Sequence, residues 1–226
     1  MSDTNRPPGG RRLQAVLFDM DGTLVDTEGV WLDVVESAAV RRGRTLDAER
    51  RTAVTGRSVE DTADLLHAHL GTSTEELAAE LGADFAARLA VAAAPRPGAL
   101  RLLAALRASR VPTALVSASP RAVVAQVAST LDGHRFDALF GAEDTVRTKP
   151  EPDPYLAAAD ALGAEPARCV AVEDSPTGVA SAVAAGCRVL AVPSTEPLVD
   201  FAGTEGVTLA GSLTEVDPEL LNSLVG

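Results

Sequence analysis

The stretch LQAVLFDMDGTLVDT, residues 13–27, begins with the apolar run Leu13–Phe18 and ends in acidic and hydroxyl side chains. Short apolar runs separated by segments of helical periodicity are typical of parallel strands with helices on both faces. Similar runs lie at residues 113–116, 138–140, 170–172 and 189–192, with a more polar candidate at 207–209. The sequence therefore predicts an α/β fold built on a doubly wound parallel sheet.

The composition of the 226-residue chain suits a soluble globular protein with an aliphatic core, since 46% of the residues are hydrophobic and only 3% are aromatic. Cys169 and Cys187 each begin an apolar run, as buried structural thiols do, and we expect no disulfide. We find no apolar run long enough to cross a membrane and expect a cytoplasmic, monomeric protein.

The formal net charge is −12, and Lys and Arg form no cluster along the chain. Nucleic-acid binding depends on clustered basic residues that neutralise phosphates, so the charge argues against it. An anionic substrate would instead be attracted by local features, such as a bound cation, a lysine or a helix N-terminus.

The chain divides into a core and an insert. Residues 1–12 are polar and rich in Gly, Pro and Arg, which predicts a disordered tail. Between residues 28 and 96 the strand pattern disappears, and apolar residues recur at helical spacing. We therefore expect an all-helical cap at 28–96, a return hinge at 95–98, and an α/β core made of residues 13–27 and 97–226.

Several helix boundaries in the core are marked by capping residues. A Ser or Asp that precedes a proline predicts a helix start, and a Gly after an apolar periodic segment predicts a helix end. The predicted starts are Ser119-Pro120, Asp153-Pro154 and Ser175-Pro176, and the predicted ends are Gly163 and Gly186.

Acidic residues gather where the predicted strands end, which is where open parallel sheets bind ligands. Asp19 and Asp21 point the same way if the chain stays extended, and two such carboxylates need either a divalent cation between them or a proton on one of them. Glu173 and Asp174 supply further oxygen ligands of the kind that Mg²⁺ prefers. The alternative interpretation is that Glu173 and Asp174 only cap the helix that follows.

A phosphate beside these carboxylates needs a compensating positive charge. Lys149 can supply it from a segment that three prolines stiffen, KPEPDP at residues 149–154. Thr23 and Ser117 are hydroxyl donors at strand ends, and backbone N–H groups of the following turns, such as that of Ala118, would complete a phosphate site. Either hydroxyl suits an ordinary turn equally well.

Taken together, these motifs resemble those of the haloacid dehalogenase superfamily, whose core is Rossmann-like. The resemblance rests on Asp19-x-Asp21-Gly-Thr23, Ser117, Lys149 and Glu173-Asp174, all present and in order. The insert looks like the cap of the subgroup that contains phosphoglycolate phosphatase, β-phosphoglucomutase and sugar phosphatases. The runs LVSASP, residues 115–120, and KPEPD, residues 149–153, resemble the mutase and sugar-phosphatase branch more closely.

The resemblance implies an Mg²⁺-dependent phosphatase for a small phosphomonoester. Asp19 would attack phosphorus and form an aspartyl phosphate, and Asp21 would act first as acid and then as base. Mg²⁺ would be held by Asp19, the backbone carbonyl of Asp21 and Asp174, with Glu173 in support.

The phosphoryl oxygens would be held by Lys149, Ser117 and Thr23, and the cap would close over the site. Dehalogenases of this superfamily need no metal, so Asp21 and Glu173-Asp174 argue against dehalogenation. A non-catalytic binding protein on the same fold is the remaining alternative class.

The cap residues bear on a second alternative, a phosphomutase. Counted without gaps from Asp19, the cap histidine of β-phosphoglucomutase falls at Trp31, and its cap arginine, aligned through Gly56-Arg57-Ser58, falls at Val59. Both departures favour hydrolysis over phosphomutase activity, although Arg57 is a second candidate for the role of the cap arginine. Trp31, Arg57 and Ser58 are therefore our candidate substrate contacts, with Trp31 equally suited to packing the cap.

The histidines are expected to play no part in the chemistry. His67 and His69, two residues apart on a predicted helix, face different directions, which is typical of surface residues. His134 lies in a turn-like segment, and we expect it to be solvated.

Overall fold

A parallel sheet of six strands, in the order β5-β4-β1-β6-β7-β8, forms the centre of the computed structural model, which describes residues 13–55, 57–92, 94–193 and 203–226. Each neighbouring pair of strands is parallel. The strands are β1 (Ala15–Phe18), β4 (Thr113–Val116), β5 (Ala138–Phe140), β6 (Cys169–Glu173), β7 (Arg188–Ala191) and β8 (Val207–Leu209). All six coincide with the predicted apolar runs to within two residues, so the predicted α/β fold is confirmed.

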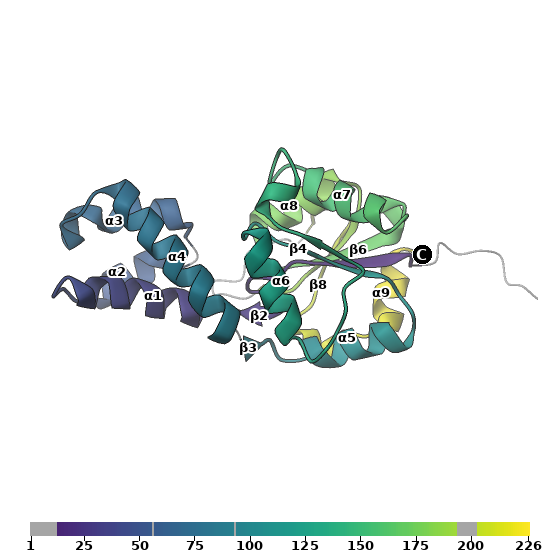
Figure 1. Ribbon diagram of the computed structural model, residues 1–226. Coiled ribbons are helices and arrows are strands. Elements are labelled where there is room, and N and C mark those ends of the chain that lie inside the picture. Colours follow the sequence, from purple (N-terminus) through teal and green to yellow (C-terminus); the bar gives the residue numbers. More distant parts are fainter. Residues whose placement is uncertain (1–12, 56, 93, 194–202) are drawn as a thin grey trace, which may run out of the picture.

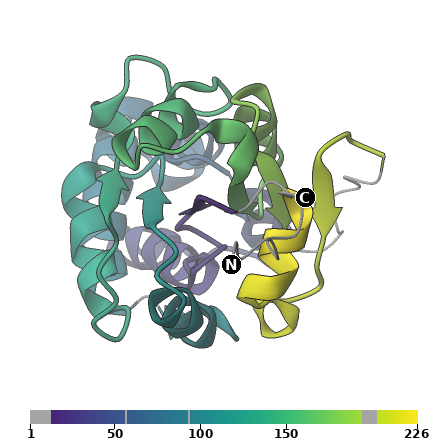
Figure 2. The ribbon, with the colours of Figure 1, turned by 90° about the vertical axis from the view of Figure 1, so that its right-hand side faces the viewer.

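β1 lies in the middle of the sheet, between β4 and β6. Val16 pairs with Thr113 on one side and with Val170 on the other. Figure 2 shows β1, in purple, between teal strands on one side and green strands on the other. Every residue of these three strands is buried, because helices cover both faces of the sheet. This two-sided burial explains why their sequences are nearly continuous apolar runs.

The helices of the core form a layer on each face of the sheet (Figure 1). One face packs against α5 (Ala99–Ala108), α6 (Arg121–Thr130) and α9 (Pro218–Leu224), and the other against α7 (Asp153–Ala161) and α8 (Pro176–Ala184). Short 3₁₀ helices lie at η1 (Ala142–Asp144), η2 (Pro166–Arg168) and η3 (Leu213–Glu215). The two apolar clusters are aliphatic and Ala-rich, as the composition predicts.

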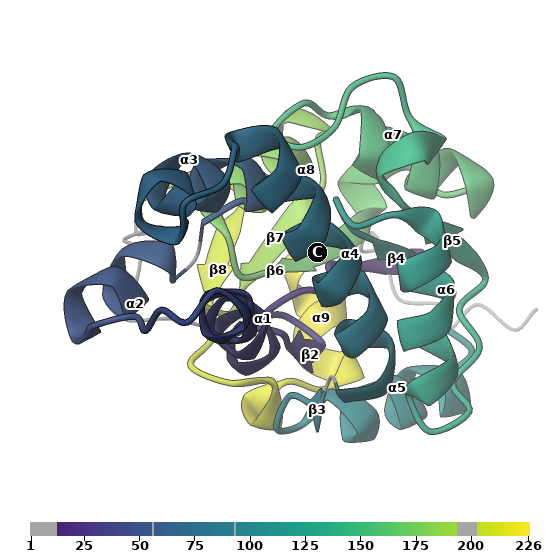
Figure 3. The ribbon, with the colours of Figure 1, turned by 60° about the vertical axis from the view of Figure 1, so that its left-hand side comes forward.

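A helical insert leaves the core after β1. It consists of α1 (Glu28–Arg41), α2 (Ala48–Val54), α3 (Val59–Leu70) and α4 (Thr74–Ala92), and Figure 3 shows these helices in front of the core strands. Apolar residues of α3 and α4 are buried in a separate cluster inside the insert, with Leu66, Leu77 and Leu81 among its fully buried residues. The predicted helical insertion is therefore confirmed.

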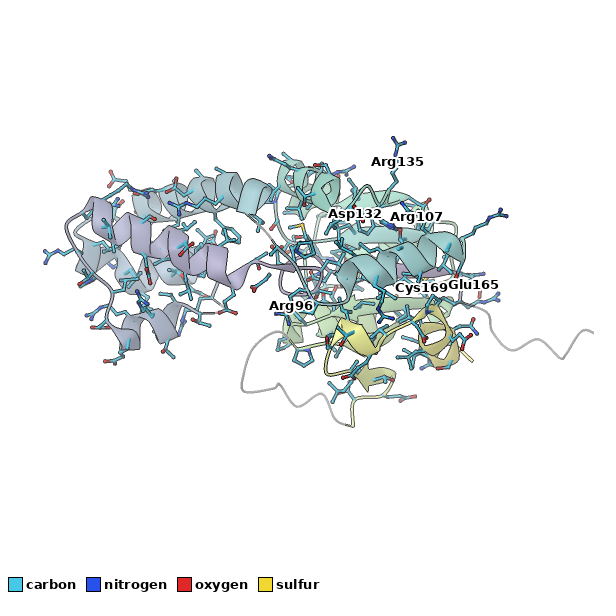
Figure 4. All side chains as sticks on the ribbon, turned by 90° about the horizontal axis from the view of Figure 1, so that it is seen from below. Arg96, Arg107, Asp132, Arg135, Glu165 and Cys169 are labelled. Carbon is cyan, nitrogen blue, oxygen red and sulfur yellow. The ribbon has the colours of Figure 1, made fainter. Side chains whose placement is uncertain are left out.

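The two chain crossings between insert and core lie side by side. β2 (Val25–Asp26) and β3 (Ala94–Pro95) pair antiparallel, with Val25 opposite Pro95. The backbone N–H of Arg96 then donates to the Leu24 carbonyl at 2.8 Å, and Figure 4 places Arg96 at this junction. The sequence predicts a hinge here but no strand, because two-residue strands are too short to show alternation. The division of the chain at residues 28 and 97 stays a prediction.

The predicted helix starts are only partly correct. Ser175 caps α8, since its side chain accepts a hydrogen bond from the N–H of Gly178. Ser119 does not cap α6, because its hydroxyl donates to Asp21 at 3.0 Å. Asp153 lies one residue inside α7, and its carboxylate accepts from Arg147 instead. The pairing of a capping residue with a proline therefore located these helices, but it did not assign the side chain's partner.

Both cysteines are free and buried, as predicted. Burial raises the pKa of Cys169 to about 11 and that of Cys187 to about 12, so both thiols stay protonated at neutral pH. Within the described ranges, no helix combines the length and the apolar character that crossing a bilayer requires. The predicted tail, residues 1–12, lies outside the described residues.

His134 is buried, which corrects the expectation that it is solvated. Its side chain is 8% exposed, and its Nε2 lies 3.0 Å from the Thr113 hydroxyl, at the start of β4. The ring packs edge-on against Phe136. Burial lowers the pKa of His134, and Arg107 on α5 (Figure 4) lowers it further, against the opposing effect of Asp137. The turn-like sequence around His134 gave no sign of this packing, which depends on α5 and β4.

The folded protein should lose stability as acid protonates the unfolded chain at His134. The pKa of His134 is lower in the folded protein than in the unfolded chain. The stability that neutral His134 contributes is therefore fully present above its unfolded pKa of about 6.5, and it falls as the pH drops through that value. The measurement is the free energy of urea unfolding of wild type and His134→Gln between pH 8 and pH 5. The difference between the two proteins should shrink towards low pH, and a constant difference would contradict the assignment. His67→Gln, on partly exposed α3, controls for the loss of a histidine.

Candidate active site

The predicted core residues meet at the carboxyl ends of three adjacent strands. Asp19 follows β1, Ser117 follows β4, and Glu173 is the last residue of β6. The N–H of Asp19 donates to the Val172 carbonyl at 2.9 Å, which holds the Asp19 backbone alongside β6. Since β1 lies between β4 and β6, the topology brings together segments that are far apart in the sequence.

The Lys149 ammonium group lies at the centre of this cluster. Its Nζ donates to Asp19 Oδ1 and to Glu173 Oε1, each at 2.6 Å, and to the Val116 carbonyl at 3.0 Å. Only 7% of the lysine side chain is exposed. Burial by itself would lower the pKa of Lys149, but the carboxylates of Asp19 and Glu173 outweigh this effect and raise it above its ordinary value. Lys149 is therefore a fixed positive charge.

Glu173 is fully buried, and both of its carboxylate oxygens accept hydrogen bonds. Oε1 accepts from Lys149 and from the Tyr155 hydroxyl, each at 2.6 Å. Oε2 accepts from the N–H of Asp174 and from both the N–H and the hydroxyl of Ser175. With so many protein donors already in place, Glu173 is suited to hold its neighbours in position.

Tyr155 and Gly178 belong to the site although sequence reasoning did not find them. The Tyr155 ring lies below the Lys149 ammonium, 5.2 Å from Nζ to the ring centroid. Gly178, in the first turn of α8, leaves no room for a side chain, since a Cβ there would lie 1.9 to 2.1 Å from the Glu173 carboxylate atoms. The one available signal was that Tyr155, the only tyrosine of the chain, follows the Lys149 segment closely.

Asp21 is held by two serines. Its Oδ2 accepts from the Ser117 hydroxyl at 2.9 Å and from the Ser119 hydroxyl at 3.0 Å. The next residue, Gly22, has a φ of +77°, which turns the chain back after Asp21 and favours glycine. Burial raises the pKa of Asp21, and the two hydroxyls and Lys149 oppose the rise. A carboxyl group with a raised pKa is suited to donate a proton near neutral pH.

The predicted phosphate-binding residues lie in the same place. The Thr23 hydroxyl is buried and donates to Asp174 Oδ1 at 3.3 Å. The Ser117 hydroxyl both donates to Asp21 and accepts from the N–H of Ser119. Ala118, the next residue of that turn, is exposed. These groups come from the turns after β1 and β4, and they contact the acidic residues Asp174 and Asp21.

The acidic residues fit a divalent cation. Asp19, Glu173 and Asp174 each place one carboxylate oxygen within 4.8 Å of the others. Among the described residues, Asp19 Oδ2 and Asp21 Oδ1 are buried without a hydrogen-bond partner, a costly arrangement unless a cation or other donor is bound. Burial raises the pKa of Asp19, Lys149 opposes the rise, and the nearby carboxylates of Glu173, Asp174 and Asp21 add to it. A bound cation would favour the ionised form.

The three candidate residues of the insert contact other parts of the insert. Trp31 is 6% exposed, its Nε1 donates to the Val54 carbonyl at 3.1 Å, and its ring packs edge-on against Phe85. The Arg57 Nε donates to the Ala53 carbonyl, and the Ser58 side chain caps α3. Of the two alternatives for Trp31, the structure favours packing.

The chain is similar to several known proteins. Residues 13–186 match the haloacid dehalogenase-like hydrolase family. The chain is 33% identical to validoxylamine A 7'-phosphate phosphatase of Streptomyces hygroscopicus subsp. limoneus, covering 90% of this chain and 95% of that protein. It is 37% identical to hexitol phosphatase A of Escherichia coli K12, covering 80% of this chain and 83% of that protein.

Two further relatives extend the comparison. The chain is 34% identical to a bifunctional riboflavin kinase/FMN phosphatase of Arabidopsis thaliana over 79% of its own length, and it spans 48% of that longer protein. Among solved structures, a CbbY variant from Rhodobacter sphaeroides in complex with xylulose-(1,5)bisphosphate superposes with a TM-score of 0.71 at 26% identity, covering 90% of this chain and 96% of that one.

Removing the Lys149 charge should destabilise the metal-free protein. Lys149→Met leaves the buried carboxylates of Asp19 and Glu173 facing each other, and we expect the free energy of unfolding to fall by about 3 kcal/mol. Urea unfolding in EDTA at pH 7 measures this loss. The matched control is Arg147→Met in the same segment, which breaks exposed ion pairs and should cost much less. Equal stability of the two variants would contradict the central role of Lys149.

Proposed function

Since this chain belongs to the haloacid dehalogenase-like hydrolase family and is a phosphatase of that family, we propose that it hydrolyses a small sugar phosphate or similar phosphomonoester with Asp19 as nucleophile. The observation that carries the proposal is the position of Lys149, which contacts both Asp19 and Glu173 at the ends of β1 and β6. This buried ammonium lies where a phosphoryl group approaching Asp19 needs a positive charge.

The first step transfers the phosphoryl group to the enzyme. A carboxylate oxygen of Asp19 forms a bond to phosphorus, and the bond from phosphorus to the ester oxygen breaks. Asp21 donates its proton to that departing oxygen, which leaves as an alcohol. The raised pKa of Asp21 supports this role, because it favours the protonated form that the step requires.

The second step releases phosphate. Asp21, now ionised, takes a proton from water, and the water oxygen bonds to phosphorus as the bond to Asp19 breaks. Inorganic phosphate is released, Asp19 is again a carboxylate, and Asp21 is again protonated. The same residue thus acts as acid and then as base, which requires that its carboxylate keep its position between the steps.

The transferring phosphoryl group would be held by Lys149, Thr23, Ser117 and the backbone N–H of Ala118. Ser117 has a single hydroxyl proton, which it now donates to Asp21. When Ser117 turns to a phosphate oxygen, Ser119 remains as a donor to Asp21. Ser119 therefore supports the proposed acid and base while Ser117 binds substrate.

We assign the cation to Mg²⁺, held by Asp19, Asp174 and the backbone carbonyl of Asp21, with Glu173 in support through its hydrogen bonds. When bound, Mg²⁺ would supply positive charge that offsets repulsion between the phosphate and the carboxylates. The unpartnered Asp19 Oδ2 supports this assignment. Asp21 and the Glu173-Asp174 pair are the residues that a metal-free dehalogenase would not need.

The substrate class is inferred from relatives and from the insert. By name, the relatives are phosphatases for validoxylamine A 7'-phosphate, for hexitols and for FMN, and the CbbY variant binds xylulose-(1,5)bisphosphate. We propose that the insert closes over the strand ends and selects the leaving group. Trp31 and Val59 stand where a mutase would have a histidine and an arginine, and Trp31 is packed inside the insert. Both observations favour water over a second sugar hydroxyl as acceptor.

Activity should depend on Asp19. Phosphate release is measured with Mg²⁺ over a panel of hexitol, hexose, ketose-bisphosphate, glycolate and nucleotide phosphates, with glucose 1-phosphate isomerisation followed in parallel. Asp19→Asn, which keeps the shape but not the nucleophile, should lower kcat by about a thousandfold or more while the protein stays folded. Wild-type-like turnover in this variant would refute the mechanism, and isomerisation without phosphate release would establish a mutase.

Mg²⁺ should stabilise the protein as well as activate it. EDTA should abolish phosphate release until Mg²⁺ is returned, and Mg²⁺ at about a hundred times its Kd should raise Tm by roughly 5 °C. Asp174→Asn should lose most of the Mg²⁺-dependent rise in Tm, because it removes a proposed ligand. Asp160→Asn, on the exposed side of α7, is the matched control and should keep it. Full activity of metal-free protein would disprove the assignment.

A further inference from the structure

We propose that Tyr155 is a positioning residue, which acts through Glu173 to hold the Lys149 ammonium against Asp19. The proposal rests on the function proposed above, since it concerns the same site. Tyr155 lies in α7 and is fully buried, and its hydroxyl donates to Glu173 Oε1 at 2.6 Å. Lys149 donates to that same oxygen atom at 2.6 Å. The two donors therefore meet on one acceptor, and the position of that acceptor fixes the distance between them.

Glu173 needs such support because water cannot reach it. Its side chain is fully buried, so a carboxylate oxygen that loses a protein donor has no solvent to replace it. Ser175 and the N–H of Asp174 hold Oε2 from the side of α8. The other oxygen, Oε1, accepts from Lys149 and from the Tyr155 hydroxyl, which is the uncharged one of its two donors.

The carboxylate is confined between α7 and α8. Tyr155 approaches it from α7, while the backbone at Gly178 in α8 is so close that a Cβ there would lie 1.9 to 2.1 Å from the carboxylate atoms. These contacts leave Glu173 little freedom to change rotamer. Lys149 has a long, flexible side chain, so its ammonium position depends on the fixed atoms Glu173 Oε1 and the Val116 carbonyl.

The Tyr155 hydroxyl is not required for packing. The ring lies in the apolar cluster between the sheet and α7–α8, where phenylalanine would fill the same space. The ring also lies 5.2 Å below the Lys149 Nζ, a contact that phenylalanine would keep. Tyr155→Phe therefore removes the hydrogen bond to Glu173 and little else, which makes it a clean test.

The experiment compares the full-length wild type with Tyr155→Phe, using para-nitrophenyl phosphate with saturating Mg²⁺ and orthovanadate as an analogue of the transition state. We expect kcat to fall about tenfold or more, as for other residues that orient groups in a site. KM should change by less than about twofold, since the lost alignment matters mainly in the transition state. Inhibition by orthovanadate should weaken by a factor similar to that in kcat.

A second variant and a control separate positioning from general loss of stability. Gly178→Ala displaces the Glu173 carboxylate from the opposite side, and it should lower kcat with the same small change in KM. Thr113→Val removes a buried hydroxyl at the far end of β4 and should leave kcat unchanged. Melting temperatures of all three variants identify any that fail to fold. If either Tyr155→Phe or Gly178→Ala does not fold, the kinetics of the other variant test the inference.

The outcomes also distinguish this inference from the proposed function. If the wild type releases phosphate and Tyr155→Phe matches it in kcat and in vanadate inhibition, Tyr155 has no positioning role. A loss of kcat in Thr113→Val equal to that in Tyr155→Phe would likewise overturn the inference. A wild type that hydrolyses neither para-nitrophenyl phosphate nor any compound of the metabolite panel would instead refute the proposed function itself.

Discussion

One buried ammonium group organises the site. Lys149 contacts the carboxylates of Asp19 and Glu173, Asp174 lies beside them, and one positive charge does not balance this group of acidic residues in a region of low exposure. The nearby carboxylates contribute to the raised pKa of Asp19, and one oxygen of Asp19 has no hydrogen-bond partner. A bound divalent cation would offset the negative charge of these carboxylates and would also attract a phosphate group. These residues are therefore consistent with a metal-dependent phosphatase.

The sheet and its helices hold these charges close together. β1 lies between β4 and β6, so the residues that follow these strands share one edge. The strands are buried on both faces, and the polar residues begin where the apolar runs end. Asp19, Ser117 and Glu173 thereby lie at the ends of rigid strands, whereas Lys149 comes from the segment before α7. That residue is held in place by its hydrogen bonds to Asp19, Glu173 and the Val116 carbonyl.

A second group of residues holds the first in place. Ser119 donates a hydrogen bond to Asp21 beside that of Ser117, and Tyr155 and Gly178 confine Glu173 from two helices. The insert has a core of its own, linked to the sheet through the β2–β3 ribbon and through α4, whose Leu89 belongs to the apolar cluster of the core.

The amino-acid sequence alone determined the α/β fold, the helical insert and the main acidic residues, because these depend on local patterns. Apolar runs report strands buried on both faces, and Asp19-x-Asp21-Gly-Thr23 is a contiguous motif. Only the tertiary structure decided that Tyr155 reaches Glu173, that Ser119 binds Asp21 rather than capping α6, and that His134 is buried. Each of these contacts joins segments that are separated in the sequence. A hydrogen bond between such segments produces no repeating pattern of residues, so it cannot be predicted from either segment alone.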